Sequence, residues 1–215
     1  MYDAAAPPVP DTSSHRSPRK AVLLNGALPG DEALAPIEAA VEGVLRDRGT
    51  QVRRFEIRRI SLAYCQGCFE CWTRSPGLCK TDGDAGREIA ATVIESDLAV
   101  CLTRVTFGGY SSEIKKVLDR MICLVLPFFL RVEGEVHHRR RYAAYPSIAA
   151  VGVMEELDLE QERVFRSLVG RNARNLHAPA HAVSVLPANI PTAAVHGRLE
   201  DDLEPVLRTL AGRAA

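Results

Sequence analysis

The chain alternates short, continuous apolar runs with longer segments in which apolar residues recur at helical spacing. Continuous runs of this length are typical of strands buried on both faces of a parallel sheet. The predicted strands are 21–25, 52–57, 98–103, 148–154 and 182–186, and the predicted helices are 34–49, 87–95, 111–126, 157–176 and 199–210. Five strands alternating with helices predict an α/β fold in which helices cover both faces of the sheet.

The first nineteen residues lack this periodicity. They are rich in Ala, Pro and Ser, a composition that buries too little apolar surface to offset the entropy of ordering. We therefore predict a disordered tail over 1–19 and a single folded domain over 20–215. A length of 215 residues suits one domain with a tail.

Composition excludes several classes of partner. The 27 Lys and Arg residues balance the 27 Asp and Glu residues, so no overall field attracts nucleic acid or an anionic membrane. The longest apolar run, 121–130, is short and contains Pro127. It predicts no membrane span, and the N-terminus carries no signal-like apolar core. We expect a cytoplasmic protein that binds neither nucleic acid nor membrane.

Four cysteines lie within fifteen positions after the second predicted strand. They are Cys65, Cys68, Cys71 and Cys79. In a chain without a secretion signal, such a group favours metal binding or redox chemistry over disulfides. Gly67 and the Pro76-Gly77 turn allow the loop to fold back on itself, so the four thiolates can converge.

Three interpretations of this cysteine loop stay open. Convergent thiolates suit an iron–sulfur cluster, and three close cysteines with a later fourth favour a cubane cluster. Zinc is the second interpretation, and reduced thiols packed beside a cofactor are the third. Cys101 and Cys123 fall in a predicted strand and helix, where we expect them to be buried small apolar side chains.

Residues 20–120 resemble the iron–sulfur flavoproteins within the flavodoxin-like NAD(P)H-dependent FMN reductases. The resemblance rests on the four cysteines, on Ser96-Asp97, and on 107–112 leading to Lys115 and Asp119-Arg120. It implies a flavodoxin-like three-layer α/β/α sandwich with a five-stranded parallel sheet of order 2-1-3-4-5. It also implies FMN at the carboxyl edge of the sheet and a 4Fe-4S cluster on the cysteine loop.

In that strand order, ligands bind where the order reverses, between the first and third strands. Gly108 and Gly109 permit close approach of the backbone to a flat ring, while Phe107 and Tyr110 offer apolar faces. The predicted cofactor-binding residues are Asn25, Gly26, Leu28, Gly30, Arg104, Thr106, Phe107, Gly108, Gly109 and Tyr110.

The first of these loops departs from the family pattern. It lacks the hydroxyl and arginine side chains that relatives place around the FMN phosphate, and it carries Asp31 and Glu32. Arg104 stands where relatives usually have proline, and it could supply the missing positive charge. Backbone amides at a helix N-terminus can also bind phosphate.

Two charged segments follow the third strand. Lys115, Lys116, Asp119 and Arg120 are expected to form an exposed, paired helix face. His137, His138, Arg139, Arg140 and Arg141 lie in the connection to the fourth strand, which we interpret as a loop. They could grip a nicotinamide or flavin phosphate, or form a solvated loop.

The sequence therefore predicts an FMN-containing NAD(P)H-dependent oxidoreductase that passes electrons from a small-molecule or protein donor to an acceptor. Because the cofactor supplies the chemistry, no catalytic side chain is assigned. Two alternatives remain: a cluster-free FMN reductase of quinones or other small acceptors, and a flavin-free zinc scaffold. A homo-oligomer, dimer or tetramer, is expected by analogy with flavodoxin-like reductases.

Overall fold

The computed structural model describes residues 19–132 and 134–212, and it contains one five-stranded parallel sheet. The strands are β1 (Arg19–Asn25), β2 (Thr50–Glu56), β3 (Leu98–Arg104), β6 (Ser147–Met154) and β7 (His181–Pro187). Their spatial order, β2-β1-β3-β6-β7, is the predicted order 2-1-3-4-5. All five predicted strands are confirmed to within two residues at each end.

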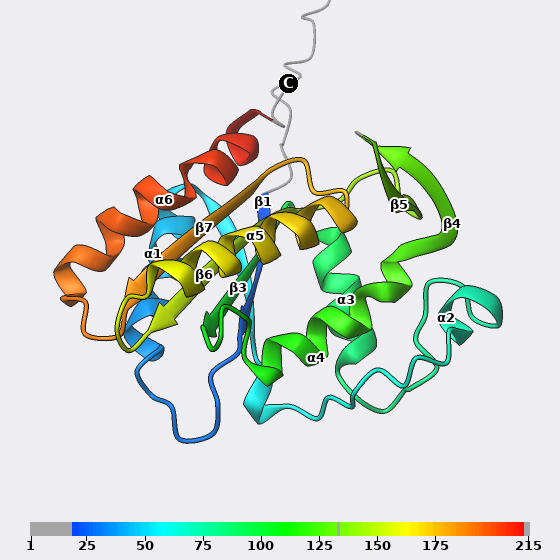
Figure 1. Cartoon of the computed structure of the whole chain (residues 1–215), viewed down its shortest axis with the longest axis horizontal. Helices are drawn as coiled ribbons and strands as arrows, with labels where there is room; N and C mark the ends of the chain where they lie inside the picture. The colour runs from blue at the N-terminus through cyan, green and yellow to red at the C-terminus, as the bar shows by residue number, and fades with distance from the viewer. Residues whose placement is uncertain (1–18, 133, 213–215) are drawn as a thin grey trace, which may run out of the picture.

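Helices cover both faces of this sheet (Figure 1). One face carries α1 (Ala35–Asp47) and α6 (Thr192–Gly212). The other carries α3 (Gly86–Glu95), α4 (Ser112–Arg120) and α5 (Leu159–Asn175). The two faces of each central strand are therefore both buried, which explains why these strands are continuously apolar rather than alternating.

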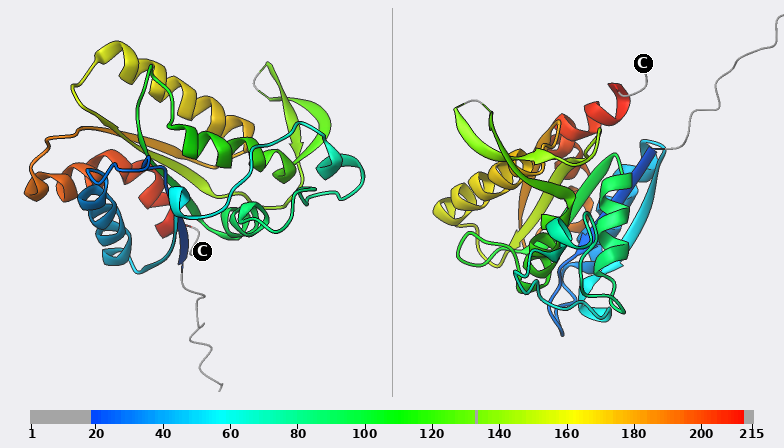
Figure 2. Two further views of the ribbon diagram at one scale, coloured as in Figure 1. Left: turned by 90° about the horizontal axis from the view of Figure 1, so that it is seen from below. Right: turned by 90° about the vertical axis from the view of Figure 1, so that its right-hand side faces the viewer.

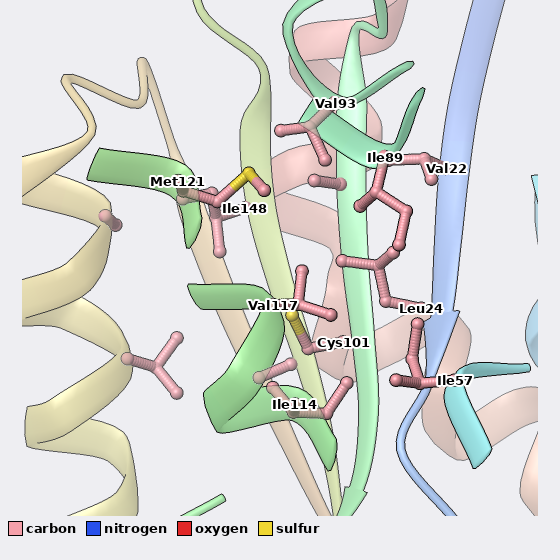
Figure 3. Close-up of a cluster of buried hydrophobic side chains, with 14 of the residues drawn as sticks. Val22, Leu24, Ile57, Ile89, Val93, Cys101, Ile114, Val117, Met121 and Ile148 are labelled. Atoms are coloured by element: carbon pink, nitrogen blue, oxygen red, sulfur yellow. The ribbon is translucent and has the colours of Figure 1, made fainter. Parts of the chain in front are cut away.

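The core beneath α3 and α4 positions the candidate site. Val22 and Leu24 of β1 meet Ile89 of α3 and Ile114 of α4 in one buried cluster, as Figure 3 shows. Cys101 of β3 lies in the same cluster and is almost fully buried, as the sequence predicted. Packing on this face fixes the start of α4 against the sheet edge.

The connection after α4 corrects the predicted helix 111–126. The α-helix ends at Arg120, a 3-10 turn η2 (Met121–Leu124) follows, and Leu126 lies in a strand. Pro127 cannot donate a helical hydrogen bond and disfavours helical conformation at Leu126, which explains why Leu126 is extended. The segment interpreted as a loop is an antiparallel hairpin of β4 (Val125–Val132) and β5 (Glu135–Arg140).

This hairpin lies away from the main sheet, beside the connection between β2 and α3 (Figures 1 and 2). We call this connection, which carries the four loop cysteines, the cysteine segment. The cysteine segment contains η1 (Ile57–Arg59) and the short helix α2 (Glu70–Thr73). Two further boundaries differ from prediction: Arg19 belongs to β1, and α6 begins at Thr192 rather than at 199. The rest of the predicted tail, 1–18, lies outside the described residues. No helix in the described ranges combines the length and apolarity needed to cross a membrane.

Candidate functional site

The loops at the carboxyl edge of the sheet are tied together by hydrogen bonds. The Gly26 amide donates to the Leu102 carbonyl at 2.8 Å, and the Ser111 hydroxyl donates to the Gly26 carbonyl at 2.7 Å. A Cβ on Gly26 would lie 2.3 Å from Ile114, which explains why glycine occupies this position. The predicted loops 26–31 and 104–110 therefore meet at one edge.

A tight turn presents Phe107 to solvent at this edge. Thr106 and Gly109 exchange backbone hydrogen bonds of 3.1 and 2.9 Å, while Phe107 and Gly108 have φ of 52° and 71°. Two consecutive left-handed residues are typical of a primed turn. The Phe107 side chain is 92% exposed, so its ring is free to contact a ligand. Leu28 of the first loop is also exposed.

Tyr110 points away from this surface. Its ring packs edge-on against Phe165 with centroids 5.2 Å apart, and its hydroxyl accepts a hydrogen bond from Asn172 at 3.3 Å. Burial raises the pKa of Tyr110 above its usual value. The residue therefore belongs to the packing beneath α5, and it does not offer the stacking face suggested by the sequence.

Arg104 lies in the predicted site but is already paired with carboxylates. Its Nε and Nη2 donate to the two oxygens of Asp31 at 2.8 and 3.0 Å, and its Nη1 donates to Glu155 at 2.7 Å. The hydrogen bond from Arg104 lowers the pKa of Asp31. This ion-pair cluster, which we call the Asp31 clamp, joins the loops after β1, β3 and β6.

Five backbone amides of the first loop are also occupied. Those of Gly26, Ala27, Asp31, Ala33 and Ala35 each donate to an acceptor within the chain. Asn25 takes part, since its side-chain oxygen accepts the Ala27 amide at 2.8 Å. Arg58 donates to the carbonyls of Leu28 and Asp31. The exposed Phe107 and Leu28 offer apolar contact to a flat ring, whereas the carboxylates paired with Arg104 and Arg58 oppose a phosphate dianion in this arrangement.

The four loop cysteines line a different space, a cavity of about 550 Å³ between the cysteine loop, the end of α4 and the hairpin. Cys71 is buried, Cys65 and Cys79 are half-buried, and Cys68 is exposed. Burial, together with the neighbouring thiols, raises the pKa of Cys71. Within the described ranges, no three Cys, His, Asp or Glu side chains are placed as ligands of one metal ion.

A buried ion pair anchors this loop to α4. Arg120 is only 2% exposed and donates to Asp84 at 2.8 and 3.1 Å and to the Ala63 carbonyl at 3.0 Å. Burial opposes ionisation of Asp84, but the hydrogen bonds from Arg120, Ala63 and Gly86 outweigh it and lower its pKa to about 2. The prediction of an exposed Arg120 was wrong, whereas Lys115 and Asp119 do form an exposed pair.

The hairpin closes the other side of the cavity through aromatic contacts. Trp72 of α2 stacks on Phe69 at 4.9 Å and contacts His138 of β5 at the same centroid distance. The Trp72 indole donates to the carbonyls of Ile122 and Val125 at 3.1 and 3.0 Å. Phe129 of β4 packs on His138 at 4.6 Å, so an aromatic row links the cysteine loop to the hairpin.

The basic run divides into residues held within the fold, His137 and Arg141, and the exposed Arg139 and Arg140. Arg141 donates to the carbonyls of Cys123, Val125 and Cys71, and His137 is buried against Asn175 and Glu135. Arg139 donates one hydrogen bond, to the Phe129 carbonyl. These contacts direct Nε and Nη2 of Arg141 to main-chain carbonyls within the fold.

Sequence reasoning missed several residues of both regions. Glu155 and Arg58 complete the charge network at the sheet edge, and Phe129, Asn172 and Asn175 line the cavity. Cys123 also lines the cavity, although it is buried as predicted and burial raises its pKa to about 11. Pro127 followed by strand-forming residues was the signal that could have revealed the hairpin.

No protein-family model matches the sequence, and no curated protein sequence matches it. Solved structures do. An NAD(P)H:quinone oxidoreductase from Methanothermobacter marburgensis has a TM-score of 0.61 at 11% identity, over 93% of this chain and 98% of that one. An FMN-dependent NADH-azoreductase from Bacillus anthracis, in complex with FMN, has a TM-score of 0.59 at 10% identity, over 92% and 100%.

A third neighbour is the apo form of an NADH:FMN oxidoreductase, with a TM-score of 0.57 at 11% identity over 90% of this chain and 87% of that one. Together with the strand order, these similarities establish the fold class as a flavodoxin-like α/β/α sandwich. The predicted fold is therefore confirmed.

Proposed function

We propose that this protein is an NAD(P)H-dependent oxidoreductase that carries FMN at the carboxyl edge of its sheet. The observation that carries this proposal is the exposed Phe107 turn at the point where the strand order reverses. Structural neighbours include enzymes described as FMN oxidoreductase, quinone oxidoreductase and FMN-dependent azoreductase, which supports both the cofactor and the donor.

In this proposal the chain binds and orients the flavin, which supplies the redox chemistry. The ring lies against the Phe107–Gly108 turn, beside the exposed Leu28. The acceptor is a small molecule or a protein. Cytoplasmic location and a homo-oligomeric state remain predictions from the sequence.

Anaerobic stopped-flow spectroscopy tests this function. Protein reconstituted with about one equivalent of flavin per chain is mixed with NADH or NADPH. The flavin absorption at about 450 nm is then followed. We expect bleaching by a nicotinamide donor and recovery on adding a quinone. A protein that binds flavin but is reduced by neither donor would contradict the NAD(P)H assignment.

A second proposal concerns the cysteine loop, in which Cys65, Cys68, Cys71 and Cys79 hold a 4Fe-4S cluster. Its support is that all four thiols line one cavity, although they are not placed as metal ligands in this arrangement. Soft thiolates select iron–sulfur clusters or zinc, so loading would draw the loop together around the group.

Metal and sulfide analysis of anaerobically purified protein tests the cluster. Serine at any loop cysteine should lower iron and sulfide content, whereas serine at the sheet residue Cys101 should not. FMN should survive these changes, because its site lies at the other end of α4. Equal iron content in the wild type and the loop variants would refute the cluster. Zinc in place of iron would favour the zinc alternative.

A further inference from the structure

In the first loop, where a flavin phosphate would bind, the Asp31 carboxylate already occupies Arg104. We propose that Asp31 competes with the flavin phosphate for Arg104, so that the closed clamp makes the chain select flavins by their ring alone. This inference rests on the proposed flavin site. It identifies Asp31 as the residue that determines specificity at the phosphate end.

The geometry of the clamp supports competition for one donor group. Two parallel N–H groups of Arg104 face the two oxygens of Asp31, at 2.8 and 3.0 Å. A guanidinium offers the same two-pronged arrangement to a phosphate. The third nitrogen of the guanidinium, Nη1, donates a hydrogen bond to Glu155 at 2.7 Å. A phosphate can therefore take the two-pronged position on Nε and Nη2 only by displacing Asp31.

The other arginine of this loop is paired as well. Arg58 is held by two carbonyls and by Glu56 and Glu32, and the amides of Gly26, Ala27, Asp31, Ala33 and Ala35 donate within the chain. A small hollow at the start of α1 is lined by acids that include Asp31, Glu32 and Glu56 and by Arg58 and Arg59, and both arginines pair with these acids. The closed clamp therefore gives FMN no advantage over riboflavin, which has the same ring without the phosphate.

Flavin titration of the apoprotein, by isothermal calorimetry at low salt, tests this inference. In the wild type we expect riboflavin to bind at least as tightly as FMN. Asp31→Asn keeps the size of the side chain and removes its charge, which frees Arg104. The variant should bind FMN at least about tenfold more tightly and leave riboflavin affinity within about threefold. High salt should reduce the gain in FMN affinity.

Two further variants control for charge and folding. Glu32→Gln removes the same charge from the same loop, but Glu32 pairs with Arg58 and not with Arg104. We expect it to change the ratio of FMN to riboflavin affinity by less than about threefold. In Asp31→Asn combined with Arg104→Gln, the gain in FMN affinity should disappear. Circular dichroism reports that each variant is folded.

The outcomes separate this inference from the proposed function. If wild-type protein binds FMN more than tenfold more tightly than riboflavin, or Asp31→Asn leaves FMN affinity unchanged, the competition is refuted while the flavin site stands. If Glu32→Gln gives the same gain as Asp31→Asn, general charge explains the effect and the clamp does not. If folded protein binds neither flavin in any variant, the proposed function and this inference both fail.

Discussion

At the scale of single residues, the most consequential contact outside the flavin edge is the buried pair of Asp84 and Arg120. It joins the end of the cysteine segment to the end of α4, and Arg120 also holds the Ala63 carbonyl just before the first loop cysteine. A buried charge left without its partner is strongly destabilising. The shape of the cysteine cavity therefore depends on this pair.

We expect Asp84→Asn to lower the free energy of unfolding by about 3–5 kcal/mol, the usual cost of removing one partner of a buried pair. Urea unfolding followed by circular dichroism measures it. Asp119→Asn breaks the exposed pair with Lys115 and should cost less than about 1 kcal/mol. Equal losses in the two variants would contradict the anchoring role.

The same pair predicts a pH dependence. Because the pKa of Asp84 falls from 3.8 to about 2, its contribution is complete above pH 3.8 and is lost as the pH drops towards 2. Wild-type protein should therefore lose stability over this range, and the loss attributable to Asp84 should vanish in Asp84→Asn. An identical acid dependence of the two proteins would refute the assignment.

The sequence could not reveal this pair. Arg120 follows Lys115, Lys116 and Asp119 at helical spacing, a pattern typical of an exposed face. Only the approach of residues 81–86 to the end of α4, a tertiary contact, buries Arg120. The same holds for Arg104. The sequence shows that an arginine stands at an unusual position. It does not show the ion pairs of Arg104 with Asp31 and Glu155, because these pairs join segments at the ends of three different strands.

At the scale of elements, the hairpin of β4 and β5 forms one wall of the cavity. An isolated two-stranded hairpin has little stability of its own, so docking must hold it. Trp72 and Arg141 provide that docking through main-chain carbonyls around η2. Trp72 is the single tryptophan of the chain, and its fluorescence therefore reports this junction directly.

Arg141→Gln should loosen the hairpin, because three carbonyls lose their donor. We expect a red shift of Trp72 emission and faster hydrogen exchange in β5. Arg139→Gln removes one hydrogen bond, to the Phe129 carbonyl, and should leave both signals near those of the wild type. The hairpin is docked by other contacts if Arg141→Gln also leaves the emission unchanged.

The turn before Ser111 gives a second prediction at this scale. Gly108 has φ of 71°, and a Cβ there would lie 2.6 Å from Val164, whereas Gly109 has only an ordinary contact of 3.4 Å with the Thr106 carbonyl. Gly108→Ala should therefore destabilise the protein by about 1–3 kcal/mol and weaken flavin binding. Gly109→Ala should be nearly neutral in thermal unfolding. The reverse ranking would show that the turn has another conformation.

At the scale of the whole molecule, hydrophobic patterning was sufficient to predict the sheet. Both faces of β1, β3 and β6 are buried, and the unbroken apolar runs of these strands indicate this burial in the sequence. The sequence did not predict the hairpin, because the apolar residues after α4 continue to Pro127 without a glycine or proline that would indicate the end of the helix. Which thiols and which loop residues share a surface was decided by packing between distant segments, which local patterns do not encode.

The architecture separates two regions of different chemistry. Flavin-edge residues gather at the start of α4, and the cysteine cavity lies at its end. Loss of the cysteines should therefore leave the flavin edge intact. This separation makes flavin binding the simplest test of the whole account.

The most direct measurement is the flavin content of anaerobically purified protein after incubation with FMN or riboflavin. Equilibrium dialysis followed by absorption spectroscopy gives the stoichiometry without requiring tight binding. We expect about one flavin per chain, with binding weakened by Phe107→Ala and retained in Cys71→Ser. Folded protein that binds neither flavin at concentrations up to the millimolar range would contradict the flavin site and, with it, the proposed oxidoreductase.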